Sequence, residues 1–139
     1  MFTNRQPPVI LAMKPLRVIY VDDMRELREL VREVLQRGGH TVECYADGRQ
    51  VLDRLVKNPD IDLLITDHHM PGINGLELVA QVREGIYLGK IIVFSSELRR
   101  DVAKSYRALR VDRILAKPIF PTDLRRVIAE LFPAPACIG

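Results

Sequence analysis

Five short apolar segments alternate along the chain with five segments of helical periodicity, and this alternation restricts the possible fold more than any other feature. Strands that alternate with helices pair in parallel and are covered by helices on both faces of the sheet. We therefore predict an α/β fold built on a doubly wound, parallel, five-stranded sheet. The predicted strands are residues 16–21, 41–45, 61–66, 90–96 and 111–116.

The predicted helices carry apolar residues that recur at three- and four-residue spacing. The first has Leu27, Leu30 and Val34 on one face and ends at Gly38, because glycine commonly terminates helices. The other four are expected at residues 46–58, 75–84, 100–109 and 122–132, of which 100–109 is the least cleanly amphipathic.

The alternating pattern covers residues 16–132, which we predict to form a single domain. Residues 1–15 and 133–139 fall outside it and are expected to be tails, the second with the Pro/Ala-rich composition of a linker. The apolar stretch within the first tail is too short to span a bilayer and lacks the layout of a signal peptide.

Composition narrows the class of partner. The chain of 139 residues is 47% hydrophobic and 28% charged, as in globular proteins, and its net charge of +3 comes from interspersed charges of both signs. No nucleic-acid reader motif is present, and Cys44 and Cys137 form neither a disulfide framework nor a metal knuckle. We therefore expect a cytoplasmic protein whose partners include neither membrane nor nucleic acid.

Polar residues follow four of the five predicted strands at the point where each strand ends. In open α/β sheets, ligands bind beyond the carboxyl ends of the strands, so these side chains are expected to converge on one rim. The residues concerned are Asp22-Asp23, Asp67, Ser95-Ser96 and Lys117-Pro118.

The residue types at this rim suit phosphoryl transfer. Three carboxylates held together repel one another unless a cation joins them, and oxygen ligands with room for water and phosphate favour Mg²⁺. Two carboxylates can hold the ion while the third acts as a nucleophile towards phosphorus. The Ser95 hydroxyl and the Lys117 ammonium can then neutralise phosphoryl oxygens.

In this order the motifs resemble the receiver domain of two-component response regulators, of the chemotaxis-regulator type. The resemblance rests on the pair Asp22-Asp23, the stretch DHHMPGINGLEL that begins at Asp67, the hydroxyl of Ser95 and the KP pair at Lys117. It implies a flavodoxin-like (βα)5 fold with strand order 2-1-3-4-5.

The resemblance also implies roles for individual residues. Asp67 would be the phosphoacceptor, and Asp22, Asp23, Asp67 and the main-chain carbonyl of His69 would hold Mg²⁺ or Mn²⁺. Ser95 and Lys117 would contact the phosphoryl group, and the peptide bond before Pro118 is often cis in the family.

Two further positions would tune the lifetime of the phosphoryl group. His69 and Glu97 each lie two residues past a key position, and in the family such residues flank the path of attack. Adjacent histidines cannot both face one ion from regular backbone, so we expect His68 and His69 to be exposed rim residues rather than metal ligands. An acidic pair before a helix can also serve as a cap, and Asp23 is placed to do so.

The sequence departs from the family pattern near the fifth strand. Ile114 stands where the family usually has an aromatic switch residue, and Arg110-Val111 replaces a common Gly-Ala pair. Tyr106, in the predicted fourth helix, is a candidate replacement for that aromatic, although a tyrosine there also suits the core or the surface.

The resemblance implies a signalling domain that takes a phosphoryl group from a phosphohistidine on a histidine kinase or phosphotransfer protein. Such a domain catalyses its own phosphorylation and dephosphorylation and turns over no external substrate. Its output surface would be the fourth helix, fifth strand and fifth helix, which would bind a downstream protein or a second copy of the chain. A phosphorylation-independent binding module is the alternative, and an aspartyl-phosphate hydrolase of the haloacid-dehalogenase type would need an Asp where His69 stands.

Overall fold

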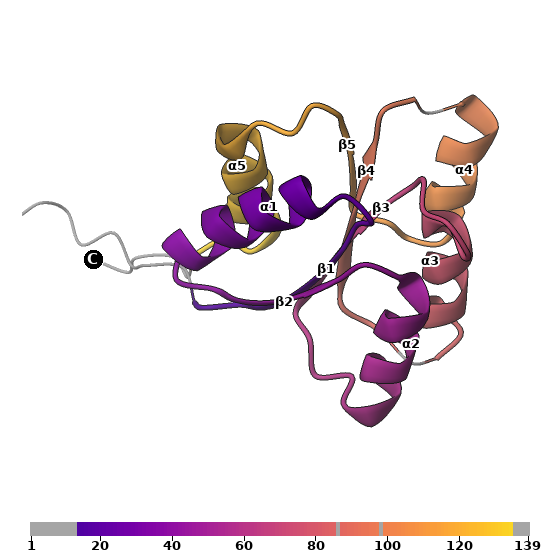
Figure 1. Ribbon diagram of the computed structural model, residues 1–139, viewed down its shortest axis with the longest axis horizontal. Helices are drawn as coiled ribbons and strands as arrows, with labels where there is room; N and C mark the ends of the chain where they lie inside the picture. Colours follow the sequence, from indigo (N-terminus) through magenta and orange to yellow (C-terminus); the bar gives the residue numbers. More distant parts are fainter. Residues whose placement is uncertain (1–13, 86, 98, 135–139) are drawn as a thin grey trace, which may run out of the picture.

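A computed structural model describes residues 14–85, 87–97 and 99–134. Its five strands form one parallel sheet in the order β2-β1-β3-β4-β5 (Figure 1). The strands are β1 (Arg17–Val21), β2 (Thr41–Tyr45), β3 (Leu63–Asp67), β4 (Lys90–Ser95) and β5 (Arg113–Ala116). The helices are α1 (Arg25–Arg37), α2 (Gly48–Lys57), α3 (Gly75–Arg83), α4 (Arg100–Ala108) and α5 (Pro121–Leu131).

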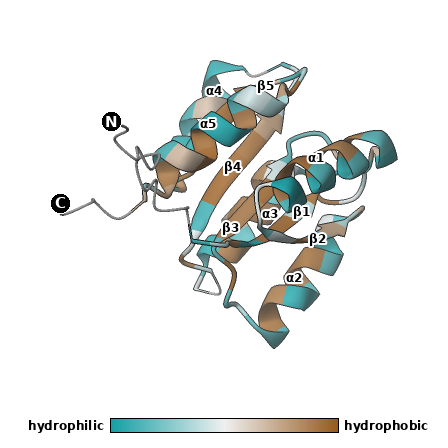
Figure 2. Cartoon of the chain, turned by 90° about the vertical axis from the view of Figure 1, so that its left-hand side faces the viewer, coloured by the Kyte–Doolittle hydropathy of each residue, from teal (hydrophilic) through white to brown (hydrophobic). Residues whose placement is uncertain are grey.

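Helices cover both faces of the sheet. In Figure 1, α1 and α5 lie on one side, and α2, α3 and α4 lie on the other. Successive residues of a strand point to opposite faces, so the central strand β3 supplies Leu63 and Ile65 to the core beneath α1 and α5, and Leu64 to the core beneath the other three helices. Figure 2 shows the apolar surfaces of the helices turned towards the sheet.

The predicted fold class and strand order are confirmed, with small differences at the ends of elements. The third strand begins at Leu63 instead of residue 61, because Ile61 forms a turn in which its N–H donates to the carbonyl of Pro59. The fifth begins at Arg113 instead of residue 111. The preceding turn contains Arg110, whose φ of 61° is incompatible with an extended strand.

Burial of the strands differs across the sheet. Every residue of β3 is buried, whereas β5, at the edge, is half-buried or exposed along its length. Cys44, on the other edge strand, is partly buried, and Cys137 lies outside the described residues, as do most of the two predicted tails. Within the described part of the chain, no helix combines the length and apolar character needed to cross a membrane.

Candidate functional site

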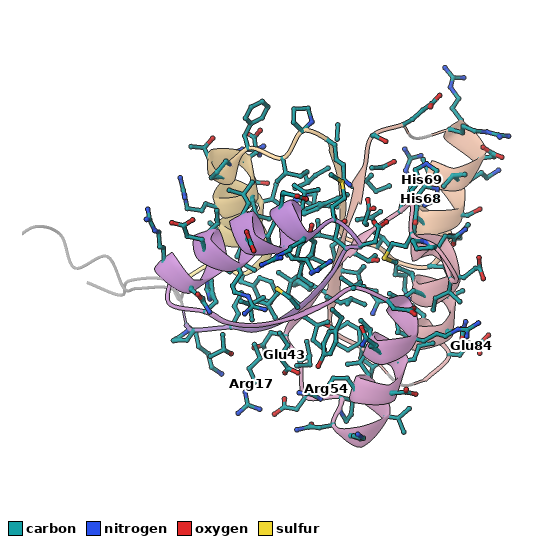
Figure 3. The ribbon with its side chains drawn as sticks, viewed as in Figure 1. Arg17, Glu43, Arg54, His68, His69 and Glu84 are labelled. Atoms are coloured by element: carbon teal, nitrogen blue, oxygen red, sulfur yellow. The ribbon has the colours of Figure 1, made fainter. Side chains whose placement is uncertain are left out.

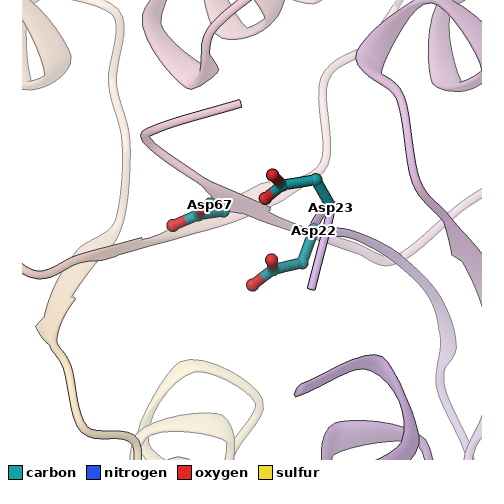
Figure 4. A group of neighbouring side chains, drawn as sticks. All are labelled: Asp22, Asp23 and Asp67. Atoms are coloured by element: carbon teal, nitrogen blue, oxygen red, sulfur yellow. The ribbon is translucent and has the colours of Figure 1, made fainter. Parts of the chain in front are cut away.

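Three carboxylates meet at the carboxyl ends of β1 and β3. Asp22 and Asp23 directly follow β1, and Asp67 is the last residue of β3. One oxygen of each lies within 4.8 Å of one oxygen of the other two (Figure 4). Asp22 is 0% exposed and Asp67 is 4% exposed, whereas Asp23 is open to solvent. The cluster is therefore buried on one side and accessible on the other.

The Asp22 carboxylate is held through both of its oxygens. Oδ1 accepts a hydrogen bond from the N–H of Met24 at 2.9 Å, and Oδ2 accepts one from the Tyr20 hydroxyl at 2.7 Å. Arg28 donates to the main-chain carbonyl of Asp22 at 2.8 Å. Met24, not Asp23, is the N-cap residue of α1, so Asp23 does not serve as the cap and its side chain faces the rim.

Lys117 joins two of these carboxylates from the end of β5. Its Nζ lies 2.8 Å from Asp67 Oδ1 and 3.6 Å from Asp22 Oδ2. The lysine is placed by a hydrogen bond from its main-chain N–H to the carbonyl of Ser95, at 2.9 Å, and a cis peptide bond links it to Pro118. Four of the five side chains that the sequence analysis assigned to the ion and the phosphoryl group, Asp22, Asp23, Asp67 and Lys117, thus lie close together.

The pKa of the Asp67 carboxyl is raised above its usual range. Burial is the main cause; the hydrogen bond and positive charge of Lys117 lower the pKa, while the negative charge of Asp22 raises it further. One ammonium therefore does not fully offset the burial of the Asp67 carboxylate. A cation in contact with these oxygens would favour the ionised form.

Ser95 is the last residue of β4, the strand that pairs with β3, and Glu97 follows it by two residues. Asp67 pairs with Phe94 on the adjacent strand β4, and Ser95 is the next residue along β4. Ser95 is 3% exposed, and its Oγ donates to the main-chain carbonyl of Glu97 at 2.9 Å. The Glu97 and His69 residues are both exposed, consistent with positions on the open side of the site.

The prediction that both histidines are exposed is wrong for His68, which is 8% exposed. Its Nδ1 is hydrogen-bonded to the hydroxyl of Tyr106 from α4, whereas His69 is exposed. The two histidines are labelled beside α4 in Figure 3. Burial lowers the pKa of His68, with a further contribution from the charge of His69, so the neutral imidazole is favoured. This contact depends on where α4 packs, so no pattern in the sequence indicates it.

Tyr106 supplies a buried aromatic close to the phosphoacceptor candidate. Tyr106 is 0% exposed and packs in the same apolar cluster as the partly buried Ile114. A Cβ built on Gly75 would lie 2.8 Å from the Tyr106 hydroxyl, so the phenol tip rests against the start of α3. A buried aromatic side chain is therefore present in the same apolar cluster as Ile114, but it comes from α4 and not from β5, where the family usually has one.

The donor set of the cluster fits a hard divalent cation. All three converging ligand candidates are carboxylates, and oxygen-only ligation with an open side is typical of Mg²⁺ and Mn²⁺ sites, which retain water. The exposed Asp23 side leaves space for those waters and for phosphate oxygens. The residues present therefore fit such an ion.

Comparison with known proteins identifies the family. The family described as "Response regulator receiver domain" matches residues 18–129. A chemotaxis protein CheY homologue from Campylobacter jejuni is 33% identical over 120 residues, which cover 84% of this chain and 92% of that protein. The crystal structure of chemotaxis protein CheY4 from Vibrio cholerae superposes with a TM-score of 0.78 at 30% identity and covers 84% of this chain and 98% of that one.

Other relatives are much longer. The sensory/regulatory protein RpfC of Xanthomonas campestris is 29% identical over 123 residues, which cover 86% of this chain but 17% of that protein. This chain therefore spans less than a fifth of the length of that relative. By the family match, the CheY-like fold and the positions of its acidic and basic side chains, the chain belongs to the response regulator receiver domain family of two-component systems.

Proposed function

We propose that the chain accepts a phosphoryl group on Asp67 from a phosphohistidine of a histidine kinase or phosphotransfer protein. The observation that carries the proposal is the position of the Asp67 carboxylate, 2.8 Å from the Lys117 ammonium and in one cluster with Asp22 and Asp23. Receiver domains act with histidine kinases in two-component systems, which agrees with the family match.

In the proposed transfer, an Asp67 carboxylate oxygen forms a bond to phosphorus. The phosphorus–nitrogen bond of the donor breaks, its electron pair returns to the imidazole, and the product is an acyl phosphate. Asp22, Asp23, Asp67 and the main-chain carbonyl of His69 would hold a divalent ion, which when bound would supply positive charge for the phosphoryl oxygens.

Lys117 and Ser95 act on the same oxygens. The Lys117 ammonium, already beside Asp67, stabilises the charge that moves onto the phosphoryl group. The Ser95 hydroxyl is occupied by the carbonyl of Glu97, and rotation about its Cα–Cβ bond would let it donate to a phosphoryl oxygen instead. Phosphorylation would thereby release the Glu97 carbonyl from this hydrogen bond.

Dephosphorylation would return the carboxylate by attack of water on phosphorus, with release of inorganic phosphate. His69 and Glu97 follow Asp67 and Ser95 by two residues and are exposed, so they are placed to flank the entry path of this water. Both would therefore affect the lifetime of the phosphoryl group. The cycle consumes no other substrate, and its output is binding of a downstream protein, or of a second copy, through α4, β5 and α5.

A second candidate is a binding module that does not use phosphorylation. Ile114 favours it, because the usual aromatic switch residue is absent from β5. The group of Asp22, Asp23 and Lys117 around Asp67 favours the first candidate, a domain that is phosphorylated, over this second one.

Intact mass after incubation with acetyl phosphate and Mg²⁺ separates the two candidates. We expect a gain of about 80 Da, one phosphoryl group, that is absent with EDTA and in Asp67→Asn but present in Asp53→Asn, which changes an exposed carboxylate on α2. A folded protein that shows no gain and binds no beryllofluoride, a stable phosphoryl mimic, would contradict the proposal. The mimic is included because a short-lived adduct escapes the mass measurement.

A further inference from the structure

Tyr20 is a fully buried residue of β1 that reaches the acidic cluster from inside the core. It is 0% exposed and packs in the cluster beneath α1 and α5, where its ring lies 5.6 Å from that of Phe94 with the planes tilted by 55°. Residues two apart in a strand share a face, so Tyr20 points to the same side as Asp22. Its hydroxyl donates to Asp22 Oδ2 at 2.7 Å.

This hydrogen bond restricts how the Asp22 carboxylate can turn. The other oxygen, Oδ1, is held by the N–H of Met24 at 2.9 Å. With one donor on each oxygen, the plane of a completely buried carboxylate is fixed. Hydrogen bonds of this kind orient metal-ligating groups and tune their affinity for the ion.

The Tyr20 hydroxyl also shares its acceptor with Lys117. Lys117 Nζ lies 3.6 Å from Asp22 Oδ2, the oxygen that accepts from Tyr20, and 2.8 Å from Asp67 Oδ1. If the phenol were absent, a buried anionic oxygen would lose its hydrogen bond, and the nearest cation available to replace it would be Lys117. The lysine would then move away from Asp67.

We propose that Tyr20 is a positioning residue for the divalent-ion site, which holds Asp22 in the orientation of a ligand and leaves Lys117 with Asp67. The inference rests on the proposed function, since it concerns the same ion and the same acceptor. Tyr20 itself contacts neither the ion nor the phosphoryl group. Its effect passes through Asp22 and Lys117.

Tyr87 provides a matched control within the same chain. It is 1% exposed, and its hydroxyl donates to the main-chain carbonyl of Lys90 at 3.1 Å, at the amino end of β4, away from the acidic cluster. Tyr20→Phe and Tyr87→Phe each remove one hydroxyl oxygen from a buried ring and keep the ring itself. A purely structural role of the Tyr20 hydroxyl would affect unfolding in both variants and Mg²⁺ binding in neither.

The experiment is a calorimetric titration of the wild-type protein and both variants with Mg²⁺. As a second measurement of binding, the rise in Tm is recorded for each protein as Mg²⁺ is added. We expect the dissociation constant to increase about tenfold or more in Tyr20→Phe and to change less than twofold in Tyr87→Phe. Even at saturating Mg²⁺, acetyl phosphate should phosphorylate the Tyr20→Phe protein more slowly than the wild type, because Lys117 is drawn towards Asp22 and away from Asp67.

The outcomes separate the inference from the proposed function. Equal Mg²⁺ affinity in wild type and Tyr20→Phe would overturn the positioning role while leaving the receiver site intact. Equal weakening in both variants would assign the effect to loss of stability and would also overturn it. A wild-type protein that binds no Mg²⁺ would refute the ion site itself, and with it both proposals.

Discussion

Replacement of Gly75 by alanine should disturb the site without touching any of its charged groups. Gly75 is the first residue of α3, and a Cβ built there would lie 2.5 Å from the Asp67 carbonyl oxygen and 3.0 Å from His68 Cα. Contacts between carbon and oxygen are normally about 3.3–3.6 Å even when they are favourable. Both neighbours are main-chain atoms, so rotation of a side chain cannot relieve the overlap.

The expected magnitude follows from two opposing effects. Alanine has the better helix propensity, by up to about 1 kcal/mol. Overpacking in a rigid environment costs typically about 1–3 kcal/mol, and here the backbone that must yield is that of the buried strand β3. We therefore expect a net destabilisation of about 1–2 kcal/mol, together with a displaced Asp67.

Gly48 provides the comparison, since it is the first residue of α2. A Cβ there would lie 2.8 Å from Ile73 Cγ1 and 2.9 Å from Ile73 Cδ1, so the Ile73 side chain, and not the main chain, must move. Gly48→Ala should therefore lower the free energy of unfolding by less than Gly75→Ala does.

Urea denaturation followed by circular dichroism measures both variants. With a urea dependence of about 2 kcal/mol per M, the middle of the typical range, the midpoint should fall by about 0.5–1 M in Gly75→Ala and by less in Gly48→Ala. Phosphorylation by acetyl phosphate should also be slower in Gly75→Ala, because misplacement of a reacting group is costly. A Gly75→Ala protein as stable and as reactive as wild type would refute the reasoning.

Three other predictions concern single side chains near the site. Asp67→Asn should be more stable than wild type at pH 7, because burial raises the pKa of the Asp67 carboxyl and so disfavours its charged form in the folded state. The difference in free energy of unfolding between the two proteins should narrow towards pH 4, as the wild-type carboxyl becomes protonated in the folded state. Urea denaturation at both pH values tests this. Tyr106→Phe should lower the free energy of unfolding by about 1–3 kcal/mol, since buried His68 loses its hydrogen-bond partner, and an unchanged urea midpoint would argue against that bond. Arg110→Gly should raise Tm, because Arg110 has a φ of 61°, a conformation that costs about 1 kcal/mol in residues other than glycine; a lower Tm would contradict this.

Much of the fold was predictable because the apolar runs and the helical spacing are local properties. The positions of Asp22, Asp67 and Lys117 at strand ends also follow from local pattern, given that parallel strands share one carboxyl edge. The strand order did not follow from pattern alone and came from the family resemblance.

Contacts between layers were not predictable in the same way. His68 continues the alternation of β3 past its last residue and so turns towards α4, but nothing in the sequence indicates that Tyr106 lies there. Tyr20 carried a usable signal, since its two-residue spacing from Asp22 places both on one face of β1. That spacing is also what an ordinary core tyrosine would show.

The charges of the cluster explain why a divalent ion suits both states of the proposed cycle. Three carboxylates and one ammonium leave two net negative charges around a largely buried point. A divalent cation brings this local charge to zero before transfer. After transfer, Asp67 no longer carries a carboxylate charge, but the phosphoryl group adds about two negative charges of its own. A divalent ion would thus neutralise the acidic cluster before transfer and most of the phosphoryl charge after transfer. Both effects require that Asp22, Asp23 and Lys117 keep their positions throughout the cycle. The two donors that hold Asp22, the Tyr20 hydroxyl from the core and the main-chain N–H of Met24, are therefore as much a part of the site as the carboxylates themselves.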